Sequence, residues 1–472
     1  MKVAIIGAGP AGLTAAYQLA KVPDIELSVF EAGPQVGGLS RSLDLWGERV
    51  DLGPHRFFSS DRRVNELWLE VVEKDYVIID RLTRIFYKNR YFHYPLKAFE
   101  ALQKLGLFEA ARCLLSYGQE KLSPTPLNGS FENWVVHRFG RRLFEIFFKT
   151  YSEKLWGITC QELDADFAAQ RIKKLSLWEA VKNAINEGRG NQHKTLVDQF
   201  AYPSEGSGMV YDRMAESIVS KGAKLHLNRP VHRALMKDGK ITGLEMEDGS
   251  VEHFDHVVST MPLSLLVSRL LEAPPEIKAA ANALRFRNTI LVYLEVEGAK
   301  HFPDNWLYVH SSNLEMGRIT NFSNWLPRPD RKTSILTLEY WCYADEPRWT
   351  ESDEDLIVLA KREIRETGLI GDAPILQGMV HRIPRCYPVY EKGYKDRLEP
   401  IETYLKSLPN LSVIGRYGAF KYNNQDHSIL MGLFAAENLI EHKKHDLWGI
   451  NTDYESYQEE AIITETGLQS VN

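Results

Sequence analysis

Three glycines and one glutamate near the N-terminus have the types and spacing that could bind a dinucleotide. Gly7, Gly9 and Gly12 form the pattern Gly-x-Gly-x-x-Gly after the apolar residues 3–6, and Glu31 ends the next strand-like run. The first glycine permits a tight turn, the second lets the backbone approach a pyrophosphate, and the third lets the helix pack against the strand. The helix start offers free N–H groups to phosphates, and the Glu31 carboxylate can accept from a ribose diol. We predict a dinucleotide site; the alternative is glycines that serve only a tight turn.

The elements that must position these residues alternate between strand and helix. Residues 3–6 are typical of a buried parallel strand, residues 13–21 have a helical pattern and residues 27–31 form a second strand. Residues 222–260 have the pattern of an antiparallel meander with Asp-Gly turns. Further expected elements are helices with many aromatics over 60–200, antiparallel strands over 285–345, a strand at 411–416, a helix over 428–440 and a polar tail after 451.

The composition limits the class of protein. The chain has 472 residues, 44% hydrophobic and 25% charged, with a formal net charge of −6. These values exclude a disordered chain, a collagen and a coiled coil. A slightly acidic chain also argues against nucleic-acid binding, which usually needs a basic face.

Cysteines and apolar runs indicate the compartment. Four cysteines lie without a Cys-x-x-Cys pair, so we expect free thiols in a reducing cytosol and no metal site. The strand at residues 3–6 follows Met1 and Lys2 without a signal peptide, and no apolar stretch reaches the ~20 residues that span a bilayer. We therefore expect a cytoplasmic protein that does not insert into membranes.

The residues after Glu31 narrow the choice of dinucleotide. The stretch Gly37-Gly38-x-x-Arg41 resembles the continuation found in flavoproteins of the amine oxidase and protoporphyrinogen oxidase superfamily. The resemblance implies FAD as a permanent cofactor. It also implies that Gly38 and Arg41 lie at the phosphates, that Val231 in the meander contacts the adenine, and that Gly415 to Ser428 complete the site near the flavin ring.

A more specific resemblance covers most of the chain in the same order. The matching segments are polar and aromatic rather than core-like, and they resemble UDP-galactopyranose mutases, the eukaryotic-type enzymes most closely. They are residues 51–58, Tyr94-Pro95, residues 169–171, 317–324, Tyr387-Pro388 and 415–428.

That resemblance implies roles residue by residue. Arg171 and Arg318 match the arginines that grip the sugar-nucleotide pyrophosphate, and His55 matches a histidine beside the flavin; these three are the expected catalytic residues. The expected substrate contacts are Tyr94, Tyr308, Tyr387, Arg416 and Tyr422. The turn that faces the flavin pyrimidine includes Gln425, Asp426, His427 and Ser428. Guanidinium forks suit a diphosphate, and tyrosines offer both a ring and a hydroxyl.

The mutase resemblance implies a redox-neutral reaction. Reduced FAD would interconvert the pyranose and furanose forms of a nucleoside-diphosphate sugar, UDP-linked, through a flavin N5–sugar adduct, with NADPH or NADH as reductant. The alternative is an FAD-dependent oxidoreductase of the amine oxidase, protoporphyrinogen oxidase or desaturase type, since it shares the cofactor motifs; apolar substrates would favour an apolar tunnel. A third hypothesis, a non-catalytic flavin-binding protein, fits poorly with a polar cleft. The sugar, the base and a homo-oligomeric state stay open.

The predicted fold class is α/β, with a Rossmann-like FAD-binding domain interleaved with a helical domain and an antiparallel-sheet domain. We expect residues 1–85, 205–285 and 386–450 to form the FAD-binding domain. Residues 86–204 would form the helical cap, residues 286–385 the sheet domain, and residues 451–472 a C-terminal tail.

Overall fold

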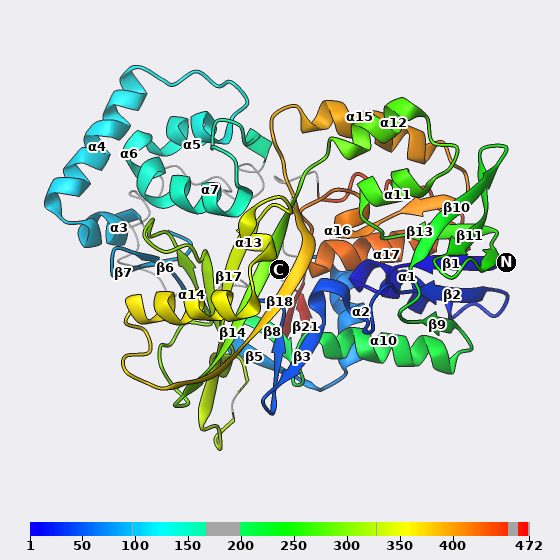
Figure 1. Ribbon diagram of the computed structural model, residues 1–472, viewed down its shortest axis with the longest axis horizontal. Coiled ribbons are helices and arrows are strands. Elements are labelled where there is room, and N and C mark those ends of the chain that lie inside the picture. The colour runs from blue at the N-terminus through cyan, green and yellow to red at the C-terminus, as the bar shows by residue number, and fades with distance from the viewer. Residues whose placement is uncertain (97, 167–198, 327, 452–460, 471–472) are drawn as a thin grey trace. The chain divides into compact units, whose positions relative to one another are not determined.

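The computed structural model describes residues 1–96, 98–166, 199–326, 328–451 and 461–470. It divides into two compact units (Figure 1). The first unit comprises residues 1–79, 200–285 and 394–472, and the second comprises residues 80–199 and 286–393. Each unit is therefore assembled from segments that lie far apart in the sequence.

A parallel sheet forms the centre of the first unit. Its order is β19-β13-β1-β2-β9, and every neighbouring pair is parallel. The central strand is buried on both faces because its residues are apolar on both, as expected when helices cover a parallel sheet. The strands are β1 (Lys2–Ile6), β2 (Glu26–Phe30), β9 (Lys224–His226), β13 (His256–Ser259) and β19 (Leu411–Val413).

Helices and a small antiparallel sheet complete the first unit. Helix α1 (Pro10–Leu19) follows β1, and α17 (Gln425–Ile440) packs against it (Figure 1). The other elements are η1 (Gly38–Ser40), β3 (Ser42–Leu45), β4 (Glu48–Asp51), α2 (Arg62–Val72), α10 (Gly208–Ser220), β10 (Val231–Lys237), β11 (Lys240–Met246), β12 (Val251–His253), α11 (Leu263–Arg269), α12 (Pro275–Asn282), α15 (Tyr394–Lys406), α16 (Gly415–Gly418), β20 (Ala461–Thr464) and β21 (Gly467–Ser470). The strands β5 (Tyr76–Asp80) and β8 (Gln199–Pro203) lie where the chain passes between the units.

The structure contains the expected meander but differs from the sequence-based description elsewhere, since residues 76–93, expected to be helical, include the strands β5, β6 (Thr83–Tyr87) and β7 (Arg90–His93). Strands β10, β11 and β12 form an antiparallel sheet, and Asp238 and Gly239 both have positive φ, as a tight hairpin requires. Helix α17 begins at Gln425, three residues earlier than expected. The polar tail contains the hairpin β20–β21, whose Thr464 carbonyl accepts a hydrogen bond of 2.7 Å from the Tyr76 hydroxyl.

The second unit contains a seven-stranded sheet with the order β18-β14-β17-β16-β15-β6-β7. All neighbours are antiparallel except β6 and β15. The strands are β6 (Thr83–Tyr87), β7 (Arg90–His93), β14 (Phe286–Glu297), β15 (Trp306–Val309), β16 (Arg318–Asn321), β17 (Thr333–Cys342) and β18 (Ile375–Pro388). The helices are α3 (Ala98–Leu105), α4 (Leu107–Leu122), α5 (Phe131–Phe139), α6 (Arg141–Phe144), η2 (Glu145–Lys149), α7 (Thr150–Trp156), η3 (Phe322–Asn324), α13 (Pro347–Thr350) and α14 (Asp353–Glu366).

This unit groups segments that the sequence assigned to separate domains. Strands β6 and β7 precede the helices in the chain but pair into the large sheet through β15. The described helices of the expected cap, α3 to α7, and the expected sheet domain both fall within the second unit.

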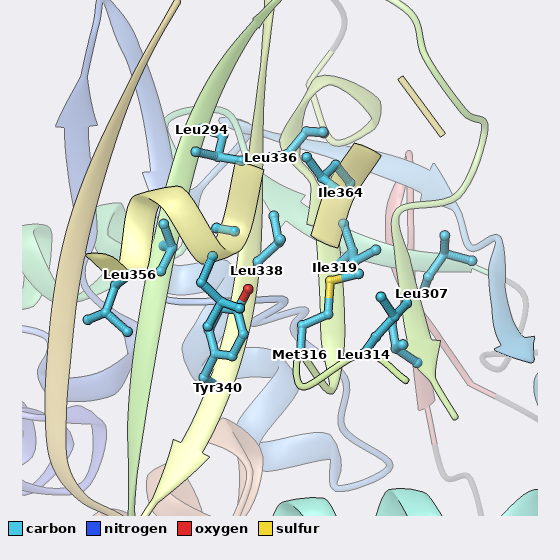
Figure 2. Packing of buried hydrophobic residues seen from close by; sticks show 14 of the residues in the cluster. Leu294, Leu307, Leu314, Met316, Ile319, Leu336, Leu338, Tyr340, Leu356 and Ile364 are labelled. Atoms are coloured by element: carbon cyan, nitrogen blue, oxygen red, sulfur yellow. The ribbon is translucent and has the colours of Figure 1, made fainter. Parts of the chain in front are cut away.

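The two faces of the large sheet differ in character because strand side chains alternate. On one face Leu336, Leu338 and Tyr340 of β17 pack with Ile319 and with Leu356 of α14 in an apolar core (Figure 2). The opposite face carries the intervening side chains of the same strands, among them Tyr308, Arg318, Glu339 and Trp341. The apolar face therefore holds the sheet together, and the other face is free to carry chemistry.

Candidate functional site

The glycine motif forms a backbone-lined turn at the end of β1. Gly7 has a φ of +97°, and a Cβ there would lie 2.0 Å from the Thr260 hydroxyl. A Cβ at Gly12 would lie 2.0 Å from the carbonyl oxygen of Gly7, so helix and turn approach too closely for any side chain.

A second glycine pair extends this turn into a cradle. Gly38 has a φ of +54°, and a Cβ on it would lie 3.0 Å from the Cα of Gly9. Helix α1 begins directly after Gly9, with Pro10 in its first turn and no side-chain cap among the described residues. The start of α1 is thus bordered by bare backbone, and its first N–H groups can receive an anion.

Glu31 stands at the edge of this cradle. Its carboxylate accepts hydrogen bonds from the backbone N–H of Ala8 at 2.8 Å and of Gly33 at 2.9 Å. It is only half-buried, so the carboxylate keeps access to a ribose. Arg41 directly follows η1 and is half-buried. Val231 is buried at the start of β10.

The C-terminal segment of the first unit contacts the start of α1, beside the glycine cradle. Gly415 has a φ of +86°, and a Cβ there would lie 3.3 Å from the Cβ of Ala11, in the first turn of α1. The next residue, Arg416, donates from Nη1 to the Asn423 carbonyl at 2.8 Å, and its guanidinium lies 4.4 Å from the ring centroid of Tyr422. Two expected substrate contacts therefore touch each other beside the cradle.

His55 is held through its backbone. Its carbonyl oxygen accepts from the Ser207 hydroxyl at 2.6 Å and from Nε2 of Gln425 at 3.0 Å. The Oε1 atom of Gln425 accepts from the Tyr211 hydroxyl at 2.8 Å. The Ser428 hydroxyl donates to the Asn424 carbonyl at 3.1 Å and is buried in the first turn of α17.

A buried carboxyl that the sequence interpretation missed supports the His55 loop. Asp51 accepts from the Ser42 hydroxyl at 2.6 Å, the Tyr202 hydroxyl at 2.8 Å and the Ser207 N–H at 3.1 Å. Burial raises the pKa of the Asp51 carboxyl to about 6, although these hydrogen bonds act to lower it. Its place in the motif segment 51–58 was the signal that could have identified it.

In the second unit, Arg318 forms a fork with Glu339. Its Nε and Nη2 donate to the two carboxylate oxygens at 2.6 and 2.5 Å, and Nη2 lies 3.4 Å from the Tyr387 hydroxyl. Burial alone would lower the pKa of Arg318, but the Glu339 carboxylate and the nearby Tyr387 and Tyr151 raise it well above its ordinary value. Arg318 is 14% exposed, and Nη1 has no partner among the described residues.

Aromatic rings extend from this fork across the polar face of the sheet. Tyr94 and Tyr308 are 4.8 Å apart between centroids, and Tyr151 lies 5.4 Å from Tyr308 and 5.7 Å from Trp341. The ring centroids of Trp341 and Trp156 lie 6.5 and 6.1 Å from the ring centroid of Tyr387, each in a T-shaped arrangement. The structure therefore brings the expected residues Tyr94, Tyr308, Arg318 and Tyr387 into one contiguous cluster.

Three further residues behind this cluster were not identified from the sequence. Tyr151 stacks on His310 at 4.9 Å, and burial with the nearby Lys154 lowers the pKa of His310 to about 3. The Lys154 ammonium donates to the carbonyls of Ser311 at 2.7 Å and Val309 at 3.3 Å, and burial lowers its pKa to about 8. Lys154 thus ties α7 to the strand that carries Tyr308. The spacing of Tyr151 and Lys154 on one helix gave no distinctive signal.

Arg171 lies outside the described residues. Among the helices of the described residues, none combines the length and the apolar character needed to cross a bilayer.

Solved structures share this fold over nearly the whole chain. Reduced UDP-galactopyranose mutase superposes with a TM-score of 0.82 at 24% identity and covers 96% of each chain. A protein described as a putative protoporphyrinogen oxidase from Exiguobacterium sp. 255-15 gives a TM-score of 0.71 at 18% identity and covers 94% of this chain and 99% of its own.

Curated relatives by sequence carry other names. Coproporphyrinogen III oxidase of Staphylococcus aureus is 22% identical over 93% of this chain and 98% of its own. The 1-hydroxycarotenoid 3,4-desaturase of Flavobacterium sp. is 39% identical over 351 residues, which are 68% of this chain and 69% of the relative.

The cradle fits an FAD-type flavin. Bare glycine backbone at the start of α1 suits the pyrophosphate, and the Glu31 carboxylate beside it suits the ribose diol. The family described as flavin containing amine oxidoreductase matches residues 10–440, and the family implies this cofactor. The chain belongs to the flavin containing amine oxidoreductases.

Proposed function

We propose that this flavoenzyme interconverts the pyranose and furanose forms of a nucleoside-diphosphate sugar, UDP-linked, with FAD in its reduced form and NADPH or NADH as reductant. The observation that carries the proposal is the polar cluster of Arg318 with Tyr387, Tyr308 and Tyr94. Tyrosine rings stack on a base or a sugar, and their hydroxyls donate to its oxygens. An arginine fork suits phosphate oxygens.

In this mechanism the protein binds and orients the substrate. Reduced flavin supplies an electron-rich ring nitrogen able to attack an anomeric carbon. Arg318 donates from Nη1 to the diphosphate, while Glu339 fixes the plane of its guanidinium. Because Glu339 balances the charge of Arg318, the net positive charge at the diphosphate must come from another cation, and we propose Arg171 for this role. These donors stabilise charge that develops on the leaving diphosphate.

His55 and the remaining tyrosines have supporting roles in the proposal. The carbonyl of His55 is fixed by two donors, so its imidazole can be held at a constant place beside the flavin. Tyr422 and Arg416 contact each other, so a sugar or phosphate group held by one is also oriented by the other. No general base is required from the chain.

The solved mutase structure supports the proposal through the extent of its similarity, 96% of both chains. A second candidate, an FAD-dependent oxidoreductase, is favoured by the curated relatives, which are named as a coproporphyrinogen III oxidase and a desaturase. The arginine and tyrosine cluster disfavours an apolar carotenoid-like substrate, which would not need an arginine fork. It does not distinguish a nucleotide sugar from a coproporphyrinogen, because a guanidinium binds propionate carboxylates as well as phosphates.

The test compares the reduced and oxidised enzyme. After reduction with dithionite, purified protein should convert UDP-galactofuranose into UDP-galactopyranose, detected by chromatography. Arg318→Ala should lower kcat/KM by about 100-fold or more, because one donor at a developing charge is lost. The flavin content should stay unchanged, because the cradle lies in the first unit.

A matched arginine controls for the general effect of losing a cation. Arg382 on β18 also forms an ion pair, with Asp353, and lies on the α14 side of the sheet. Arg382→Ala should keep its activity. Oxygen-dependent oxidation of coproporphyrinogen by the oxidised enzyme, with no turnover of any nucleotide sugar after reduction, would replace the mutase proposal with the second candidate.

A further inference from the structure

Helix α4 of the second unit exposes an unusual number of large apolar side chains. Six of the fifteen exposed large hydrophobic residues in the described chain lie within residues 107–127. Leu107, Phe108, Leu115 and Leu122 are 94%, 78%, 73% and 90% exposed. Scattered single leucines are ordinary on a protein surface, but a cluster of this kind indicates an interaction surface.

Three of these side chains form one stripe along the helix. Phe108, Leu115 and Leu122 recur every seven residues, which is close to two helical turns, and therefore project from the same side. Cys113 and Glu120 point the other way and are buried against the unit. In Figure 1, α4 lies at the outer edge of the helical group that includes α5 and α6. With 16 residues the stripe is about 24 Å long.

The charged residues of α3 and α4 are sorted by sign. Each acidic side chain lies mostly inward, because Glu100, Glu109 and Glu120 are 20%, 23% and 8% exposed. Glu109 is paired with Arg142, and Glu120 accepts from the Thr125 hydroxyl.

Each basic side chain of these two helices lies outward. Lys104 and Arg112 are 40% and 49% exposed, although they are paired with Glu100 and Glu109, and Lys121 is exposed one residue before Leu122 in the chain. The outward face therefore combines leucines and phenylalanine with cations, the pattern of a helix that lies in a membrane interface.

We propose that α4 docks this protein onto an anionic lipid surface. Phe108, Leu115 and Leu122 enter the boundary between headgroups and acyl chains, and Arg112 and Lys121 contact the lipid phosphates. In-plane binding of this kind needs no membrane-spanning helix. The inference does not depend on which reaction the flavin site performs.

A second copy of the chain is a poorer occupant of the same face. A strip about 24 Å long and ~10 Å wide lies far below the ~800 Å² that each partner of a standard interface buries. Two copies would also bring like-charged Arg112 side chains near each other across the contact.

Sedimentation of the flavin-loaded protein with vesicles tests the proposal. The protein should pellet with phosphatidylcholine vesicles that contain phosphatidylglycerol and remain in solution with pure phosphatidylcholine. Leu115→Glu should weaken binding about tenfold or more, since it places a charge in the apolar stripe. Arg112→Glu should do the same and reduce the salt dependence. Val358→Glu, on the surface of α14 and 66% exposed in the native chain, is the matched control and should bind like the native protein.

Equal flavin content and thermal midpoint in all variants would exclude unfolding as the cause. The proposal is overturned if the native protein ignores anionic vesicles, or if Leu115→Glu and Val358→Glu bind equally. Light scattering that shows a dimer, abolished by Leu115→Glu, would overturn it in favour of contact between copies.

Discussion

The buried ionisable side chains of Arg318 and Asp51 have different kinds of bonding partner. Arg318 forms a bidentate ion pair with Glu339, whose side chain is 1% exposed, so the two charges cancel. Asp51 is fully buried, and it accepts hydrogen bonds from neutral hydroxyls and a backbone N–H. The first arrangement fixes a donor at the proposed substrate site, and the second leaves a carboxyl that titrates near neutral pH.

The raised pKa of Asp51 predicts a pH effect on stability. The pKa is about 6 in the folded protein and 3.8 in its unperturbed state, so the folded protein binds this proton more tightly. The resulting stabilisation is complete below about pH 4 and is lost as the pH rises through 6. Between pH 7 and pH 5 the native chain should gain about 1 kcal/mol from Asp51.

Asp51→Asn isolates this contribution. Its amide retains an acceptor for Ser207 and Ser42 but cannot ionise, so the free energy of unfolding in urea should change less between pH 7 and pH 5 than in the native chain. Identical pH dependence in both proteins would show that Asp51 does not titrate in this range.

At the scale of elements, α1 and α17 of the first unit pack closely against each other. A Cβ on Gly432 would lie 2.5 Å from the carbonyl oxygen of Ala11 and 2.7 Å from the Cβ of Thr14. Helix α1 begins at the cradle. The first residue of α17, Gln425, donates a hydrogen bond to the carbonyl oxygen of His55. The absence of a side chain at Gly432 therefore sets the spacing of two helices that border the expected cofactor site.

Gly432→Ala should force these helices apart. Overpacking of this kind costs about 1–3 kcal/mol, so the thermal midpoint should fall and the protein should release FAD more readily. Fluorescence of released flavin during heating measures both effects. Gly118→Ala is the matched control, because a Cβ there meets nothing within 4 Å on α4, and it should be neutral or stabilising by about 1 kcal/mol. A native-like Gly432→Ala protein would contradict the packing argument.

At the scale of the whole molecule, the expected cofactor-binding residues and the proposed substrate-binding cluster belong to different units. The described residues that we expect to bind the cofactor, from Gly7 to Ser428, all belong to the first unit, and the ring cluster with Arg318 belongs to the second. Each unit has its own reason to fold: a parallel sheet under helices in one, and a large sheet with an apolar face against α14 in the other.

A substitution that destabilises the apolar core of the second unit should therefore leave flavin binding intact. Leu338 is fully buried in the apolar cluster, and Leu338→Ala should cost about 2–5 kcal/mol. The thermal midpoint should fall while the ratio of FAD to protein remains that of the native chain. Leu376→Ala, at a half-exposed position of β18, should be within about 0.5 kcal/mol of native. Loss of flavin in proportion to lost stability would show that the cradle needs the second unit.

The sequence by itself determined the features that depend on neighbouring residues. The turn from Gly7 to Gly12, the strand before it and the Asp238-Gly239 hairpin were predictable, because backbone conformation and strand alternation are local properties. The α/β fold class followed from the same patterns and from the family resemblance.

Only the tertiary structure decided the contacts and strand pairings between segments that are distant in the sequence. Arg318 meets Glu339 because two antiparallel strands place them in register, and Asp51 meets Tyr202 and Ser207 across about 150 residues of chain. Strands β6 and β7 join the large sheet, and residues 461–470 form a hairpin, because pairing depends on which edges are available after the chain has folded. The charge state of a buried group depends on all its neighbours at once, and sequence spacing does not contain that information.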